Sequence, residues 1–382
     1  MRLLHTSDWH VGKKIRGHSR HDEHAEVLSE IVGIAEDRDV DVVIVAGDLF
    51  ETAAPTPESE ALVYSTLLDL ADLGTSVVVI SGNHDNARRL RAVAPVFRRG
   101  DVLVVSEPTA PDAGGSPVLD IDGVELRLAL LPFVSQRGII RAAELMSNAA
   151  FENANAYAAR VRALIDMLTA DFSPAAVNVI VAHGFVAGGA TGGGERAAHL
   201  LDEYAVTAQA FPASASYVAL GHLHRPQKIA GAAPIHYCGS PLQLDFGEQR
   251  QRKQVNVVDA EPGAPASVDA VTLTGGRGLR TISGTIDELR SLAGDDDDWL
   301  RVRVDEARRP DLAQDVRAVL GDRVVDIEVI GASDAELEPA PERRVGRDPV
   351  DLFGEYLHDL GIEDDRLRDL FVELLDDRAG GS

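Results

Sequence analysis

The first 105 residues of the chain predict an α/β fold with a buried parallel sheet. Amphipathic stretches of helical period, at about residues 22–36 and 58–73, alternate with short apolar runs of strand length. Strands and helices that alternate at this spacing form βαβ units, in which helices cover a parallel sheet. The apolar runs lie at residues 2–5, 42–46, 77–81 and 102–105.

The rest of the chain continues this pattern and ends in smaller units. The turn dipeptide Asp122-Gly123 predicts a hairpin between residues 118–120 and 125–131. We also expect a helix at 152–169, strands at 177–181 and 217–220, and a small α/β unit made of residues 300–304, 312–320 and 324–330. The domains are therefore placed at 1–275 and 276–337, followed by a linker at 338–347 and a helical segment at 348–382.

The composition favours a reducing compartment. Cys238 is the single cysteine, so no internal disulfide can form. No apolar run approaches the roughly 20 residues of a membrane span, and the N-terminus turns polar at once. We therefore expect a cytoplasmic protein that does not enter a membrane.

The net charge of −25 is unfavourable for a polyanionic partner such as a nucleic acid. Residues 295–382 hold 26 Asp and Glu against 12 Lys and Arg, so more than half of the excess lies in this C-terminal part. Nucleic-acid binding would therefore depend on local basic patches rather than on the field of the whole protein.

Five short motifs place possible metal ligands directly after predicted strands. The carboxyl ends of parallel strands share one edge of a sheet, where ligand sites gather. Each motif alone is typical of a turn or a helix cap, but the five together predict one site. In chain order they are Asp8-x-His10, Gly47-Asp48, Gly82-Asn83-His84-Asp85, His183 and Gly221-His222-Leu223-His224.

The donor set of this predicted site suits two divalent ions. Oxygen and imidazole nitrogen donors without a thiolate favour Mn²⁺, Fe or Zn²⁺ in a reactive site over a structural zinc. Two ions about 3.5–4 Å apart clamp a phosphate and activate a bridging water. Asp48 is the predicted bridging carboxylate, because it lies between the two groups of ligands in the sequence. The predicted ligands are Asp8, His10, Asp48, Asn83, His183, His222 and His224.

His84 is the residue expected to take part in the chemistry. It follows the predicted ligand Asn83 but is not needed as a ligand itself. A charged imidazole directed at the phosphate could stabilise the transition state or protonate the leaving oxygen. Asp85 is expected to fix the tautomer of His84 and to favour its charged form.

These motifs resemble those of the calcineurin-like metallophosphoesterases. The segments at residues 4–12, 45–50 and 239–248 resemble one branch, the SbcD family, which supplies the nuclease subunits of bacterial SbcC–SbcD complexes. The resemblance is strong over residues 1–250. It implies a four-layer α/β/β/α metallophosphoesterase core, a small α/β capping domain, and C-terminal helices that dock on an ATPase.

The resemblance also implies an activity and a role for each ligand. The activity is Mn²⁺-dependent 3′→5′ exonuclease and endonuclease cleavage of DNA, in DNA replication, recombination and repair. One metal would be held by Asp8, His10, Asp48 and His224. The second would be held by Asp48, Asn83, His183 and His222, with His84 as the catalytic histidine and Asp85 as its partner.

Any nucleotide-driven work is expected to come from a partner, because the chain contains no Gly-x4-Gly-Lys-[Ser/Thr] motif. The resemblance implies an SbcC-like coiled-coil ATPase and a homodimer of this chain within a heterotetramer. An apolar stripe on the last two helices predicts the docking surface, with packing on the chain's own core as the alternative. Its residues are Leu352, Phe353, Leu357, Leu367, Leu370, Phe371 and Leu374.

Basic residues that follow two of the motifs are candidates for DNA contacts. Phosphate contacts position a protein on DNA, but a solvated helix face would explain the same charges. Two rival functions stay open: a phosphoesterase acting on phosphoproteins, cyclic nucleotides or small esters, and a scaffold whose metals only order a surface. The candidate DNA contacts are Lys13, Lys14, Arg16, Arg88 and Arg89.

Overall fold

The computed structural model describes residues 1–134, 157–193, 195, 205–294 and 296–330, with the single positions 353, 357, 366 and 367. The chain divides into two compact units, Met1–Gly331 and Ala332–Ser382. The elements below belong to the first unit. No helix in the described part of the chain is long and apolar enough to cross a membrane.

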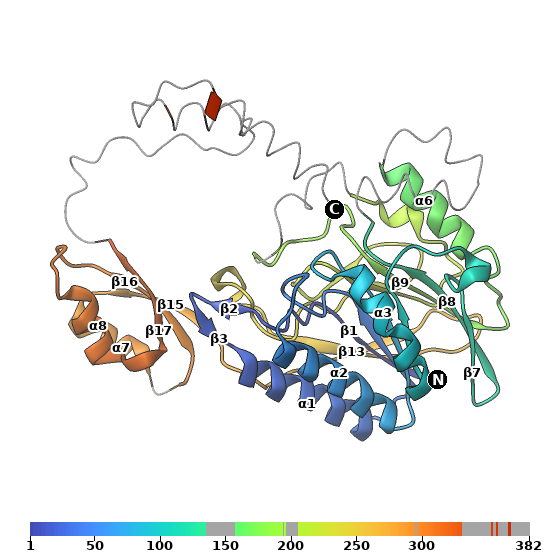
Figure 1. Ribbon diagram of the computed structural model, residues 1–382, viewed down its shortest axis with the longest axis horizontal. Helices are drawn as coiled ribbons and strands as arrows, with labels where there is room; N and C mark the ends of the chain where they lie inside the picture. Colours follow the sequence, from blue (N-terminus) through green and yellow to red (C-terminus); the bar gives the residue numbers. More distant parts are fainter. Residues whose placement is uncertain are drawn as a thin grey trace. The chain divides into compact units, whose positions relative to one another are not determined.

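Two six-stranded sheets form the centre of the first unit (Figure 1). The first has the order β14-β13-β1-β4-β5-β6, and its strands β1, β4, β5 and β6 are parallel to one another. The antiparallel strands β13 and β14 extend it at one edge. The strands are β1 (Arg2–Thr6), β4 (Val42–Ala46), β5 (Ser76–Ile80), β6 (Val102–Val105), β13 (Gln254–Asp259) and β14 (Ser267–Thr272).

The second sheet has the order β11-β12-β10-β9-β8-β7. Its four middle strands are parallel, and β11 and β7 close the two edges in antiparallel pairs. The predicted hairpin at Asp122-Gly123 is the β7–β8 pair. The strands are β7 (Val118–Ile121), β8 (Val124–Leu131), β9 (Val177–His183), β10 (Tyr217–Gly221), β11 (Gln227–Ile229) and β12 (Ile235–Tyr237).

Alternation along the strands separates three apolar cores. Leu4, Val43 and Val45 belong to the core that helices α1 and α2 cover, whereas Leu3 and Val42 belong to the core between the two sheets. A third core lies between the second sheet and α6. These layers confirm the expected α/β/β/α order. The helices are α1 (His21–Asp37), α2 (Pro57–Asp72), α3 (Ala87–Phe97) and α6 (Tyr157–Leu168).

Helix α3 was not predicted from the sequence. Its first turn is capped by Asn86, whose side chain accepts a hydrogen bond from the amide of Arg89. Leu90 and Phe97 pack on the sheet through one face. The arginines on its other positions, and Pro95 inside it, obscure the apolar period of the helix.

The small α/β unit alternates three parallel strands with two helices and has its own apolar core. Thr285 begins α7 with a capping box, in which its hydroxyl and the Glu288 carboxylate each bond a backbone amide of the first turn. Two of its strands, β16 and β17, and one helix, α8, were predicted from the sequence. The elements are β15 (Leu279–Gly284), α7 (Ile286–Ala293), β16 (Trp299–Val304), α8 (Leu312–Leu320) and β17 (Val324–Val329).

A buried ion pair at the start of α1 joins this small unit to the core. Arg20 Nη2 lies 2.6 Å from Glu23 Oε2, and the Arg20 side chain is fully buried. Glu23 also accepts hydrogen bonds from Trp299 Nε1 at 2.9 Å and from the Arg277 amide at 2.8 Å.

The remaining short elements are β2 (Lys14–Ile15), β3 (His18–Ser19) and the 3-10 turns Arg98–Gly100, Pro111–Ala113, Ala208–Ala210, Phe246–Glu248 and Gly321–Arg323.

Candidate metal centre

The five predicted motifs meet where the parallel strands of both sheets end. The amide of Asp8, after β1, donates to the Gly47 carbonyl after β4, and the amide of His10 donates to the Asp48 carbonyl. His183 is the last residue of β9, and His222 follows β10. The predicted convergence of separate strand ends on one site is therefore confirmed.

Four of the predicted ligands have backbone conformations that side-chain-bearing residues rarely adopt. Asp8, His10, Asp48 and His222 have φ angles of 53°, 49°, 53° and 106°. Positive φ costs roughly 1–2 kcal/mol for such residues, and strain of this kind gathers at functional sites. The loops that hold these side chains are thus shaped for the site rather than for local stability.

Asp48 lies at the centre of the cluster. Its Oδ2 is 3.5 Å from His10 Nε2 on one side and 3.4 Å from His183 Nε2 on the other. The donor atoms of Asp8, Asp48 and His183 lie within 4.8 Å of one another, and so do those of Asp8, His10 and His224. A carboxylate between two groups of donors has the position of a bridging ligand.

Asn83 joins the two histidines of the second predicted group. Its Oδ1 lies 3.0 Å from His183 Nε2 and 2.8 Å from His222 Nδ1. His183 Nδ1 in turn donates to the Ala46 carbonyl at 2.8 Å, which directs Nε2 towards the site. The three residues come from the ends of three strands, so the tertiary fold alone assembles this group.

Close approach to His183 explains two glycines of the motifs. A Cβ on Gly47, which has a φ of 93°, would lie 2.4 Å from His183 Nδ1. A Cβ on Gly221 would lie 1.9 Å from the Ala46 carbonyl oxygen. Only glycine therefore permits the two sheets to bring their ligands this close.

The buried charges of the cluster alter one another's proton affinity. Burial opposes ionisation of Asp48, but the surrounding histidines, His183 first, outweigh it and hold its pKa well below the usual value. Burial raises the pKa of Asp8. For His183, burial is outweighed by Asp48, and the pKa rises to about 9. The metal-free site therefore retains a proton that a cation would displace.

His84 lies beside the predicted ligands, with a ring nitrogen within 4.8 Å of donor atoms of His10 and Asp48. Its ring stands 4.6 Å from that of His10, and its amide donates to Asp48 Oδ1 at 2.8 Å. The side chain is largely buried. The residue is thus anchored to the Asp48 carboxylate through its backbone amide.

The expected contact between Asp85 and the His84 ring was wrong. The Asp85 carboxylate accepts the amides of Gly82 at 2.8 Å, Phe50 at 3.1 Å and Leu49 at 3.3 Å. Within the described part of the chain these loop amides have no backbone acceptor, and the carboxylate satisfies them. The atom that fixes the His84 tautomer is the Glu51 carbonyl oxygen, 2.7 Å from Nδ1. Burial, and then Asp48, raise the pKa of Asp85 to about 6.

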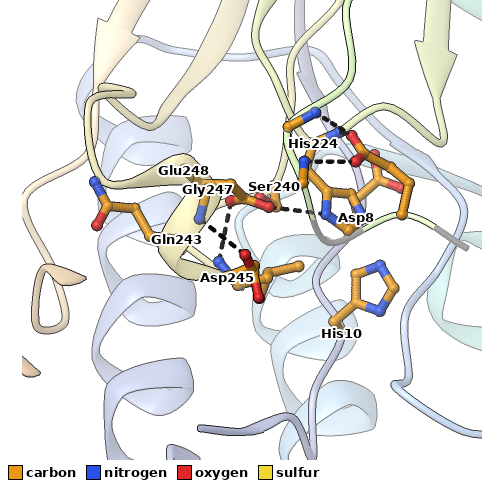
Figure 2. A network of polar contacts seen from close by, with 12 residues as sticks. Asp8, His10, His224, Ser240, Gln243, Asp245, Gly247 and Glu248 are labelled. Carbon is orange, nitrogen blue, oxygen red and sulfur yellow. Dashed lines mark hydrogen bonds and ion pairs between the residues drawn. The ribbon is translucent and has the colours of Figure 1, made fainter. Parts of the chain in front are cut away.

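A layer of carboxylates behind the ligands was missed by the sequence prediction. Glu51 Oε2 lies 2.9 Å from His10 Nδ1, and Glu248 Oε1 lies 3.1 Å from His224 Nδ1 (Figure 2). Glu195 Oε1 accepts the His224 amide at 3.0 Å. Burial opposes their ionisation, yet His10 lowers the pKa of Glu51 to about 2, and Lys253 and His224 do the same for Glu248. Their sequence signal is weak, since a lone Glu in a loop is common.

The predicted DNA contacts divide into paired and unpaired cations. Lys13 lies 2.9 Å from Glu51, Arg16 lies 3.0 Å from Asp326, and Arg89 lies 2.6 Å from Glu60. Lys14 in β2 and Arg88 in α3 are exposed and pair with no acid within the described residues. Lys14 and Arg88 thus keep their charge available for a phosphate.

Most of the predicted docking stripe lies outside the described residues, namely Leu352, Leu370, Phe371 and Leu374. The three described members are helical. Leu357 is buried, Phe353 is partly buried and Leu367 is exposed. The proposed docking role of the stripe remains a prediction.

The residues present fit a pair of metal ions. His10 Nε2 is buried and has no hydrogen-bond partner among the described residues, although it faces Asp48. A buried nitrogen without a partner is costly unless something else occupies its lone pair. The donors are oxygen and imidazole nitrogen, which suit Mn²⁺, Fe or Zn²⁺.

Comparison with known proteins agrees with this geometry. The family model described as calcineurin-like phosphoesterase matches residues 1–226, and one described as type 5 capsule protein repressor C-terminal domain matches residues 276–359. A dimetal phosphatase structure from Danio rerio matches at a TM-score of 0.42 and 11% identity, over 72% of this chain and 99% of that chain. That structural likeness is too distant to carry an argument.

Curated relatives place the chain in one branch of this family. The SbcD subunit of the SbcCD nuclease from Bacillus subtilis is 38% identical over 73% of this chain and 71% of its own length. The SbcD subunit from Escherichia coli K12 is 29% identical over 86% of this chain and 80% of its own length. The chain belongs to the calcineurin-like phosphoesterases and, within them, to the SbcD family.

Proposed function

We propose that this chain is the metal-dependent DNA nuclease subunit of an SbcC–SbcD type complex. The observation that carries the proposal is Asp48 Oδ2, which lies between His10 Nε2 and His183 Nε2 at 3.5 and 3.4 Å. The relatives named as nuclease subunits support DNA as the substrate. We further propose Mn²⁺ as the metal, 3′→5′ exonuclease and endonuclease action, and a cytoplasmic location that suits the single, buried Cys238.

The ligand assignment follows from the two groups of donors. Asp8, His10, Asp48 and His224 would hold one ion, and Asp48, Asn83, His183 and His222 the other. The bound pair would supply Lewis-acid polarisation of the phosphodiester and a water of lowered pKa. The chain's own part is to fix the donors, since the Ala46 carbonyl and the Glu51 and Glu248 carboxylates each accept a hydrogen bond from a ligand imidazole.

The role of His84 follows from its tautomer. Because Nδ1 donates to the Glu51 carbonyl at 2.7 Å, Nε2 carries the lone pair of the neutral ring. Nε2 can therefore gain a proton and pass it to the leaving 3′ oxygen, or stabilise charge on the phosphate as an imidazolium. Asp85 acts in this scheme by shaping the loop that carries His84 rather than by touching the ring.

A panel of phosphate esters separates this function from its rival. The purified chain with Mn²⁺ should cleave linear duplex DNA faster, per enzyme, than p-nitrophenyl phosphate or a phosphopeptide. A chelator should abolish cleavage, and added Mn²⁺ should restore it. Turnover of the monoester or phosphopeptide with intact DNA would favour the general phosphoesterase. Metal binding without any turnover would favour the scaffold.

The partner proposal concerns residues 348–382. We propose that Phe353, Leu357, Leu367 and the rest of the apolar stripe dock an SbcC-like coiled-coil ATPase, within a heterotetramer that holds two copies of this chain. Deletion of 348–382 should abolish co-purification with that ATPase and spare Mn²⁺-dependent cleavage by the isolated chain. An unchanged pull-down after the deletion would rule out docking through this segment.

A further inference from the structure

We propose that Glu248 is a positioning residue that holds His224 in the tautomer and orientation a metal ligand needs. Its carboxylate is fully buried, and Oε1 lies 3.1 Å from His224 Nδ1 (Figure 2). With Nδ1 donating its proton to Glu248, the lone pair of His224 is on Nε2. The proposal rests on His224 being a ligand in the proposed function.

Lys253 completes the support from the other side. Its ammonium group lies 2.6 Å from Glu248 Oε2 and also donates to the His224 carbonyl oxygen at 2.9 Å. The Leu244 amide adds a second contact to Oε2 at 3.0 Å. Oε2 is therefore occupied, and Oε1 is left to His224. The pair of residues holds His224 by its ring and by its backbone.

The same arrangement recurs at His10, whereas His183 is held differently. Glu51 Oε2 accepts from His10 Nδ1, and Lys13 lies 2.9 Å from the other Glu51 oxygen. His183 Nδ1 instead bonds the neutral carbonyl of Ala46. Among the contacts between described residues, a carboxylate supports the ring of the two histidines proposed for one ion. A carboxylate makes an imidazole more basic. Loss of Glu248 should therefore weaken the binding of that ion more than the binding of the other.

A plain buried ion pair is the rival explanation for Glu248 and Lys253. Removing one member of such a pair leaves the other charge unpaired and disrupts folding, whereas replacing both by apolar residues is often tolerated. The informative variant is therefore the double substitution Glu248→Leu/Lys253→Met. It removes the carboxylate behind His224 without leaving a lone buried charge.

The experiment measures Mn²⁺ binding by calorimetry and the His224 tautomer by ¹⁵N NMR of the metal-free full chain. Wild type should bind two ions and show His224 protonated at Nδ1. The double variant should remain folded, and the His224 proton should no longer be confined to Nδ1. It should bind one of the two ions about 10–100-fold more weakly. Nuclease activity should then fall at low Mn²⁺ and return as Mn²⁺ is raised.

The matched control is Arg20→Met/Glu23→Leu, which removes a buried ion pair that bonds Gln243, Arg277 and Trp299 rather than a proposed ligand. It should leave both Mn²⁺ affinities unchanged. If Glu248→Leu/Lys253→Met also keeps both affinities and the Nδ1 tautomer, Glu248 is only structural and the proposal is wrong. If wild type binds no Mn²⁺ at all, the proposed function fails first, while the NMR result still decides how His224 is held.

Discussion

The backbone amide of His84 donates a hydrogen bond to Asp48 Oδ1 at 2.8 Å, so the proposed catalytic histidine and the proposed bridging carboxylate are joined through the main chain. His84→Ala keeps this amide and removes only the imidazole. We expect the variant to bind the same number of Mn²⁺ ions and to lose about 10²–10⁴-fold in kcat on DNA. Metal titration and nuclease assays on the same preparation measure both quantities. Loss of Mn²⁺ together with activity would assign His84 to the metal site instead.

Metal binding should release protons at neutral pH. Asp48 raises the pKa of His183 to about 9 in the metal-free protein, so this imidazole is charged at pH 7 and must become neutral to bind a cation. Observed Mn²⁺ affinity should therefore rise with pH, by about tenfold per unit between pH 6.5 and 8.5 for each proton displaced. Calorimetry in buffers of different ionisation enthalpy counts the protons. An affinity independent of pH over this range would show that His183 is already neutral.

A substitution at Gly47 tests how closely the two sheets must approach each other at the site. Alanine at this position would place its Cβ 2.4 Å from His183 Nδ1, so Gly47→Ala should displace the imidazole and weaken Mn²⁺ binding. Gly123→Ala is the matched control, because Gly123 has a φ of 83° but no atom within 4 Å of an added Cβ. Both variants carry backbone strain, of roughly 1–2 kcal/mol. Equal Mn²⁺ affinity in the two would show that the close approach has no role in the site.

Removing one member of the buried Arg20–Glu23 ion pair should be strongly destabilising. Arg20→Met leaves the Glu23 carboxylate buried with the Trp299 and Arg277 N–H groups as its remaining donors. Breaking such a pair costs roughly 3–5 kcal/mol in the free energy of unfolding, which urea denaturation measures. Arg303→Met, which removes the exposed pair with Glu328, should leave the midpoint nearly unchanged. Equal midpoints for the two variants would contradict the account.

DNA binding should depend more on Arg88 than on Arg89. Arg88 is exposed and lacks an acidic partner among the described residues, whereas Arg89 lies 2.6 Å from Glu60. Arg88→Ala should weaken binding to duplex DNA of any sequence and lower the slope of log affinity against log salt by about 1. Arg89→Ala should change that slope less. A larger change in the slope for Arg89→Ala than for Arg88→Ala would show that the phosphate backbone does not contact Arg88.

The strands and the convergence of the motifs could be predicted from the sequence because both depend on local patterns. Apolar runs located β1, β4 and β5, and the motif residues follow where those strands end. The ends of parallel strands share an edge, so their convergence required no knowledge of side-chain packing. Helix α3 escaped prediction because its arginines and Pro95 hide its apolar face.

The support behind the ligands could not be predicted, because it depends on tertiary contacts between distant loops. Glu248 meets His224, and the Glu51 carbonyl meets His84, only after folding brings separate motifs together. For Asp85, the sequence predicted a contact that the folded chain does not make. Adjacency in sequence suggested a contact with His84, whereas the loop directs its carboxylate towards the backbone amides of Phe50 and Gly82.

The most direct test of a two-metal DNA phosphodiesterase follows cleavage of end-labelled linear duplex DNA by the isolated chain as Mn²⁺ is titrated, without ATP. Wild type should shorten the DNA with a dependence on two bound ions, and Asp48→Asn, which removes the bridging charge between His10 and His183, should bind neither ion tightly and leave the DNA intact. Intact DNA with a fully Mn²⁺-loaded wild-type chain, or full cleavage by Asp48→Asn, would contradict this account.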